Sequence, residues 1–334
     1  MRHGPGLVQL SLKRGALLAA ANWPVVAVQF AASTVFKALL AIPMAGGALL
    51  AFVLAGQRAL NPVDTGIERW SGIVAALIDQ PVALAAFLAA FGIAVLGGSV
   101  FMFLVKGGTV SVLAAGDRAA GDIERGPWGL DGLWHTAAFS PELFIEGSGR
   151  LFRRYLRLGI GLIAVYAAST AFYLAIVFGY RPVAPVAPLV GWALVTLVSG
   201  GFVLWITVVN LFYLLAQLAV AVDDTGVRAG LRLAWRFVRA DMRTVSRLFA
   251  IVLLLVVLTS AVALLAAAGL SLVAFVPLVG VVVWLPIQIV AWLVRGLVFE
   301  YLGLVALGAY LRLYRTSPAA GEATGPVAEV PLSA

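Results

Sequence analysis

Long apolar runs, separated by short polar segments, dominate the chain from residue 22 onward. An α-helix needs roughly 20 apolar residues to cross the hydrocarbon core of a bilayer, and several runs exceed that length. The runs are continuously rich in Ala, Leu and Val, whereas the strands of a membrane barrel alternate apolar and polar residues. The pattern therefore predicts an all-α, polytopic transmembrane helical bundle with about six spans. We expect these spans over residues 22–56, 81–115, 158–180, 188–222, 248–272 and 277–311.

Local helix signals refine these spans. Asn22 is expected to cap the first span, with Pro24 in its first turn, where a missing amide hydrogen costs nothing. A run of about 35 helical residues would stretch to about 50 Å, so we expect a tilt or a kink at Pro43. Short turns at residues 179–182 and 269–277 are expected to close spans three with four and five with six into hairpins.

The sequence after residue 315 is polar and carries Pro and Gly. We expect residues 1–315 to form a single transmembrane domain and residues 316–334 to form a disordered tail. The basic start of the chain imitates a signal peptide, but the apolar run that follows continues to about Gly56 with no polar mature sequence after it. A retained first span is therefore favoured.

Composition excludes a soluble domain, because 63% of the residues are apolar, 11% are charged and the mean hydropathy is +1.05. The absence of cysteine excludes disulfides and thiol chemistry. Arginine dominates the basic residues, and Ala, Gly and Val are abundant, as is typical of proteins from GC-rich bacteria. We therefore expect a bacterial inner membrane as the location.

The basic residues are distributed unevenly between the two sides of the predicted bundle. Seventeen of the 23 fall at the two termini and in the segments before spans three and five, and three fall on the opposite side. Because cytoplasmic segments carry the excess of Lys and Arg, we expect both termini in the cytoplasm. The same rule explains the sequence pI near 10.2 without nucleic-acid binding, which we do not expect.

Arginines recur at helical spacing just before the fifth span, in steps of four, four, three, four and four. They are Arg228, Arg232, Arg236, Arg239, Arg243 and Arg247. On one helix they would share a sector of about 100°, opposite an apolar sector. That apolar sector is expected to hold Val227, Leu231, Ala234, Val238, Met242, Val245 and Phe249. The pattern predicts a basic amphipathic helix that contacts anionic headgroups, at about 1 kcal/mol per basic residue, or a protein partner.

A shorter segment before the third span repeats this arrangement. Its arginines are Arg150, Arg153, Arg154 and Arg157, with Phe152, Tyr155 and Leu156 expected opposite them. The chain therefore reads as three helix-hairpin units, each a basic segment, two spans and a polar stop. The stops are at residues 115–118, 222–225 and 314–317. Such repeats occur in transporters, but duplication of hairpins is also an ordinary way for a membrane protein to grow, and we favour the latter.

The segment 226–243, which runs directly into Leu248 and the fifth span, resembles uncharacterised bacterial six-span integral membrane proteins. It is also similar to the membrane domain attached to some glycerophosphodiester phosphodiesterases, in which a cytoplasmic helix precedes a hairpin. The resemblance covers about residues 140–312 and rests on pattern rather than on invariant motifs. Since no catalytic phosphodiesterase domain is present, it implies a stand-alone membrane module and not that activity.

Catalytic motifs are missing. The two histidines, His3 and His135, have no partner at metal-ligand spacing. A phosphate-binding loop and a Gly-x-Ser-x-Gly elbow are both absent, and no predicted span carries a histidine that would activate Ser199. We therefore expect no enzymatic activity, no cofactor and no metal site.

Three charged residues within the predicted spans form a candidate polar centre. Lys106 and Glu300 lie nine and eleven residues before the inner ends of their spans, and so at nearly the same depth. An ion pair would relieve a cost of at least ~2.5 kcal/mol for each lone charge, and Arg295 is placed to compete for the carboxylate. Alternatively, Lys106 and Arg295 extend to the headgroups while Glu300 is protonated.

Two function classes follow. The first, which we favour, is a non-enzymatic module that organises anionic membrane lipids or a protein partner at its basic cytoplasmic face. The second is a small-solute or lipid transporter or channel, built from the hairpins around Lys106, Arg295 and Glu300. Polar residues are scarce inside the spans, which disfavours an ion-coupled transporter and leaves a lipid-handling groove open.

Overall fold

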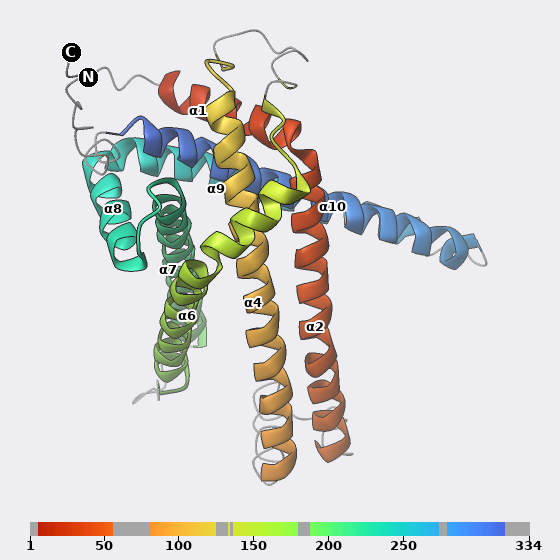
Figure 1. Cartoon of the computed structure of the whole chain (residues 1–334). Helices are drawn as coiled ribbons and strands as arrows, with labels where there is room; N and C mark the ends of the chain where they lie inside the picture. Colours follow the sequence, from red (N-terminus) through yellow and green to blue (C-terminus); the bar gives the residue numbers. More distant parts are fainter. Residues whose placement is uncertain are drawn as a thin grey trace, which may run out of the picture. The chain divides into compact units, whose positions relative to one another are not determined.

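The computed structural model describes residues 6–55, 80–124, 133, 136–179, 188–273 and 279–317. Within these ranges the chain is helical and has no strand. The helices in chain order are α1 (Gly6–Ala21), α2 (Trp23–Ala55), α4 (Pro81–Ala119), α6 (Pro141–Gly179), α7 (Pro188–Val222), α8 (Val227–Ala240), α9 (Met242–Val273) and α10 (Val279–Arg315) (Figure 1). Six of them, α2, α4, α6, α7, α9 and α10, are long and apolar enough to cross a membrane. The all-α prediction with about six spans is confirmed.

Most predicted spans agree with the helices to within a few residues, but the third begins much earlier. Helix α6 starts at Pro141 rather than near residue 158, so the basic segment 150–157 is continuous with the span. Ser140 explains the start, because its hydroxyl accepts a hydrogen bond from the Leu143 amide at 3.1 Å. Pro141 then occupies the first turn and Glu142 supplies an acidic residue there.

One of the expected breaks in the helices is wrong over part of its length. Helix α9 continues through Gly269 to Val273, so the turn predicted over residues 269–277 is wrong for residues 269–273. Residues 274–277, 180–182 and the predicted tail from 318 lie outside the described residues. Pro43 lies inside helix α2, which is continuous from Trp23 to Ala55, and the tilt or kink expected there stays a prediction.

Asn22 does not cap α2 through its side chain, contrary to the prediction. Its Nδ2 donates to the Leu18 and Thr136 carbonyl oxygens, both at 3.0 Å, and its Oδ1 accepts from the Ala138 amide at 2.9 Å. The side chain is fully buried, so its hydrogen bonds must be made within the protein. The residue therefore ties the α1–α2 junction to the segment before α6.

The chain divides into two compact units, residues 28–105 and residues 1–27 with 106–334. The smaller unit contains most of α2 and α4. Gly47 lies against the ring of Phe87 on α4, and Gly98 of α4 lies against the ring of Phe36 on α2. Each glycine thus leaves room for an aromatic side chain of the neighbouring helix.

The core of the larger unit lies at one end of its helices. This core contains helices α1 and α8. They pack there with the last turns of α4, α7 and α10 and with the first turns of α6 and α9. The fully buried side chains include Leu18, Leu113, Leu151, Leu215, Phe237, Leu248 and Leu311. The opposite halves of α6, α9 and α10 instead expose large apolar side chains, among them Phe172, Leu265 and Ile289. Exposed apolar surface of this extent suits helices that face lipid.

Small residues allow two close helix crossings in this core. Gly15 of α1 and Gly308 of α10 face each other, and a Cβ on Gly308 would lie 2.9 Å from the Gly15 Cα. A Cβ on Gly107 of α4 would lie 3.3 Å from the Gly147 carbonyl oxygen of α6. Both crossings use the small-residue packing that is common between helices in membranes.

Candidate functional site

Helix α8 is docked on the larger unit through one face. Gly230, Leu233, Ala234 and Phe237 are buried on that face. The Phe237 ring meets the Tyr314 ring of α10 edge-on, with centroids 5.3 Å apart. The predicted apolar sector is wrong in part, because it omitted Leu233 and Phe237. The buried face of α8 is determined by its contacts with other helices. These contacts cannot be predicted from the helical period of the sequence.

The predicted arginine stripe is exposed but does not lie on one helix. Helix α8 ends at Ala240, and Asp241 breaks the helical path with φ −134° and ψ 47°. The Asp241 carboxylate accepts a hydrogen bond from the Thr244 hydroxyl at 2.7 Å, in the first turn of α9. The bond joins the Asp241 side chain to the first turn of α9, where the new helix begins. All six arginines are exposed, four on α8 and two on α9: Arg228, Arg232, Arg236, Arg239, Arg243 and Arg247.

The second predicted basic segment, on α6, is also mostly exposed. Arg150, Arg153 and Arg157 are exposed, whereas Arg154 donates from Nη1 to the Asp224 Oδ1 at 2.6 Å. Opposite them, Tyr155 is fully buried and its hydroxyl donates to the Gln217 carbonyl oxygen at 3.0 Å. The segment therefore packs against α7 on one side. Helix α8 contacts both α6 and α9.

The three charged residues within the spans lie in different surroundings. The Lys106 Nζ lies 5.9 Å from the centroid of the Tyr213 ring. Among the described residues, the direct ion pairs do not include Lys106 with Glu300. The Arg295 guanidinium lies 5.7 Å from the centroid of the Phe299 ring on its own helix. The coupling of Lys106 to Glu300 stays a prediction.

A buried ionic cluster that the sequence did not reveal joins α1, α4 and α10. The Arg14 Nε and the Arg315 Nη1 each donate to one oxygen of Asp117, both at 2.5 Å. The Arg14 Nη1 also pairs with Glu124 Oε2 at 2.7 Å, and the other oxygen of Glu124 pairs with Arg312. The two carboxylates and Arg14 are almost completely buried. Three guanidinium groups and two carboxylates thus neutralise most of each other's charge.

A turn with left-handed backbone brings Glu124 into this cluster. Gly121 has φ +54°, a conformation that glycine adopts without steric cost. Its carbonyl oxygen accepts a further hydrogen bond from the Arg14 Nη1 at 2.5 Å. The segment after α4 therefore folds back onto α1 instead of leaving the bundle.

A neighbouring polar contact joins the end of α7 to the end of α10. The Tyr314 hydroxyl donates to Asp223 Oδ2. Burial raises the pKa of the Asp223 carboxyl, although the Tyr314 hydrogen bond and the Arg315 charge oppose that rise. Asp117, Asp223 and Arg315 all belong to the predicted polar stops. The polar stops in the sequence indicated this region. Their spacing does not show which of their side chains form ion pairs or hydrogen bonds with each other.

The six long apolar helices indicate a multi-pass, all-α membrane protein. Comparisons with protein-family models, curated proteins and solved structures find no match for this chain. The resemblance to phosphodiesterase membrane domains therefore stays a prediction. In the described ranges, His, Asp and Glu do not gather in a group of three that would hold a metal ion.

Proposed function

We propose that this protein is a non-enzymatic integral membrane protein that organises anionic lipids at the cytoplasmic face of a bacterial inner membrane. The arginines of α8 and of the first turns of α9 make the contact. One observation carries the proposal: all six are exposed, while the opposite face of α8 is buried against the protein. Four of these charges are thus held on the outside of a docked helix, and Arg243 and Arg247 continue the exposed surface on α9.

Two further features support lipid phosphates as the ligand. Guanidinium groups bind phosphate oxygens with paired hydrogen bonds. Trp235 is 57% exposed on the same short helix, and tryptophan is enriched where protein meets the headgroup region. Each basic residue near an anionic surface contributes about 1 kcal/mol before screening, so several arginines together give a substantial and salt-sensitive attraction.

The docked position of α8 determines how the proposal is tested. An isolated peptide of residues 226–247 would expose Leu233 and Phe237, which the protein buries. Such a peptide would insert its apolar face into vesicles for a reason that does not apply to the whole chain. The full chain is therefore the proper subject of the experiment.

The experiment counts the phosphatidylglycerol molecules retained by the full chain, by native mass spectrometry from mixed micelles that also contain phosphatidylcholine. The wild type should retain more phosphatidylglycerol than phosphatidylcholine, and added salt should reduce the excess. The quadruple variant Arg232→Gln, Arg236→Gln, Arg239→Gln and Arg243→Gln should lose most of it. The matched variant with Lys at the same four positions keeps the charge and should keep most of the excess.

Equal retention of the two lipids by the wild type, or an undiminished excess in the Gln variant, would refute the proposal. If lipid retention is unchanged but a cytoplasmic protein binds the wild type and not the Gln variant, the arginines serve a protein partner instead. A melting temperature within a few degrees of the wild type shows that the Gln variant is folded, as expected for exposed side chains.

A further inference from the structure

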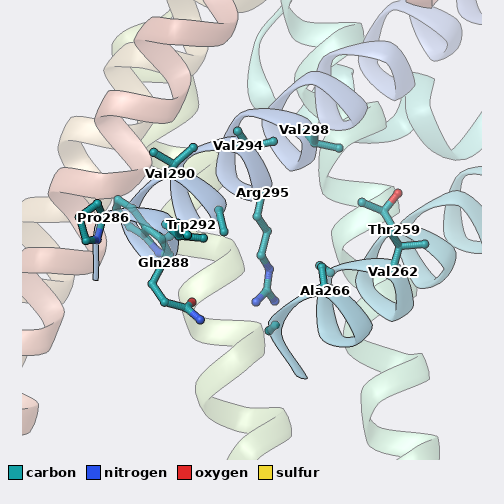
Figure 2. Close-up of a pocket in the computed structure, with 14 residues that line it drawn as sticks. Thr259, Val262, Ala266, Pro286, Gln288, Val290, Trp292, Val294, Arg295 and Val298 are labelled. Atoms are coloured by element: carbon teal, nitrogen blue, oxygen red, sulfur yellow. The ribbon is translucent and has the colours of Figure 1, made fainter. Parts of the chain in front are cut away.

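A groove between α9 and α10 combines apolar walls with one charged side chain. Its volume is 670 Å³. Figure 2 shows Arg295 and Gln288 extending from α10 into the space that faces α9. These two residues are seven apart and therefore lie on the same face of α10, about two turns from each other.

The sequence of α9 explains why the space is open. The wall on this side consists of Thr259, Val262, Ala263, Ala266 and Ala267, which recur at the spacing of one helix face. Three of the five are alanines, so the wall recedes from α10. The intervening Leu264 and Leu265 do not line the groove and are 63% and 73% exposed. The groove is thus a consequence of small residues on one face and large ones on the other.

The position of Arg295 makes its charge unusual. It follows Val279 by 16 residues and precedes Arg315 by 20, so about 24 Å and about 30 Å of helix separate it from the two ends. Among the described residues its contact is the Phe299 ring, and it forms no ion pair with an acidic side chain. An arginine held within a membrane span and facing a cavity is costly, and such residues usually serve a ligand or a pathway.

We propose that this groove draws in one anionic phospholipid of the surrounding membrane, whose phosphate lies against Arg295, deeper in the bilayer than the bulk headgroups, and one of whose acyl chains lies along the alanine face of α9. Three observations select this occupant. The walls suit a hydrocarbon chain, the guanidinium suits a phosphate, and the exposed flanks of both helices place the groove within reach of the bilayer rather than of water alone. The proposal concerns a different part of the chain from the arginines of α8 and does not depend on their function.

Trp292 lines the groove and provides a local probe, because brominated acyl chains quench tryptophan fluorescence on contact. The full chain is reconstituted in bilayers that contain brominated phosphatidylglycerol or brominated phosphatidylcholine. The signal of Trp292 is the difference between each protein and the same protein carrying Trp292→Phe. We expect phosphatidylglycerol to be preferred about fivefold at this position, because one basic residue near an anionic headgroup provides a preference of about that size.

Substitution of Arg295 separates charge from shape. Arg295→Gln should reduce the preference to about one, and Arg295→Lys should retain most of it, because the positive charge is the cause of the preference. The quadruple Gln variant of α8 should keep the preference at Trp292. Equal quenching by the two lipids in the wild type would overturn the proposal. So would a preference that survives Arg295→Gln or that disappears only in the α8 variant.

A steric variant tests the same site without touching the charge. Ala266→Leu should fill the groove and reduce quenching of Trp292 by phosphatidylglycerol to the level given by phosphatidylcholine. Ala261→Leu, an exposed position on the same helix that does not line the groove, should leave the preference unchanged. A preference that is equal in the two leucine variants would also overturn the proposal.

Discussion

At the scale of single residues, identical side chains serve opposite roles. Arg14 and Arg153 both precede a span and both count toward the basic excess of the predicted cytoplasmic side. Arg14 is buried and makes ion pairs with two carboxylates, whereas Arg153 is exposed. Replacing one partner of a buried ion pair leaves an uncompensated charge, so the cost of a substitution depends on the contacts and not on the residue type.

Two aspartates of the polar stops provide a matched comparison. Asp117→Asn should lower the free energy of unfolding by about 3 kcal/mol, because it leaves Arg14 and Arg315 short of a buried counter-charge. Asp223→Asn should be neutral or stabilising at pH 7, because burial raises the pKa of that carboxyl and its charge is unfavourable in the folded protein. Thermal unfolding of the full chain in detergent at pH 7 measures both.

The direction of the pH dependence follows from that raised pKa. The folded state takes up a proton on Asp223 at higher pH than the unfolded state, whose carboxyl has the ordinary value of 3.8. The wild type should therefore gain stability relative to Asp223→Asn as the pH falls from 7 toward that range. A relative loss of stability over this interval would show that the Tyr314 hydrogen bond outweighs burial.

At the scale of helices, the crossing of α1 with α10 depends on the absence of side chains. A Cβ on Gly15 would lie 2.8 Å from the Ala309 nitrogen and closer still to the Val305 carbonyl oxygen. Both are backbone atoms, which cannot rotate out of the way as a side chain would. The two helices would have to separate, and the ion pairs of Arg14 with them.

Gly15→Ala should therefore destabilise the protein by about 1–3 kcal/mol, as overpacking does in other cores. Gly303→Ala is the control, because a Cβ there meets no atom within 4 Å, and alanine is the better helix former by up to about 1 kcal/mol. The melting temperature in detergent should fall for the first variant and be unchanged or raised for the second. The reverse order would contradict the crossing.

At the scale of the whole molecule, the distribution of basic residues predicts that both termini face the cytoplasm. The chain has no cysteine, so single cysteines can report on each side. Gly226→Cys, at an exposed position with open space around it, should react with a membrane-impermeant maleimide only after the membrane is opened. Ala184→Cys should react in intact cells.

A third position tests whether burial of a residue, rather than the side of the membrane on which it lies, prevents its reaction with the maleimide. Ser148 lies in the predicted cytoplasmic region but is 4% exposed, and it packs against Gly107 and Gly108. Ser148→Cys should therefore react slowly whether or not the membrane is opened. Reaction of Gly226→Cys in intact cells would reverse the predicted orientation.

The sequence by itself determined the class of protein and the extent of most helices. Crossing a bilayer requires a long apolar run, and the requirement acts on each segment independently, so it can be read locally. The same local reading missed the start of α6 at Pro141, where Ser140 and Glu142 were available signals, and the interruption at Asp241, where an aspartate lies within an otherwise helical pattern.

Only the tertiary structure decided which charged residues are buried. Arg14 and Asp117 are separated by 103 residues, and Asp117 and Arg315 by 198, and no helical period connects positions so distant. The groove around Arg295 likewise requires two faces from different helices, one lined with alanines and one carrying the charge. Pairing of this kind depends on packing between segments. The pattern of apolar and polar residues along the chain indicates only whether each segment faces lipid, water or the protein interior.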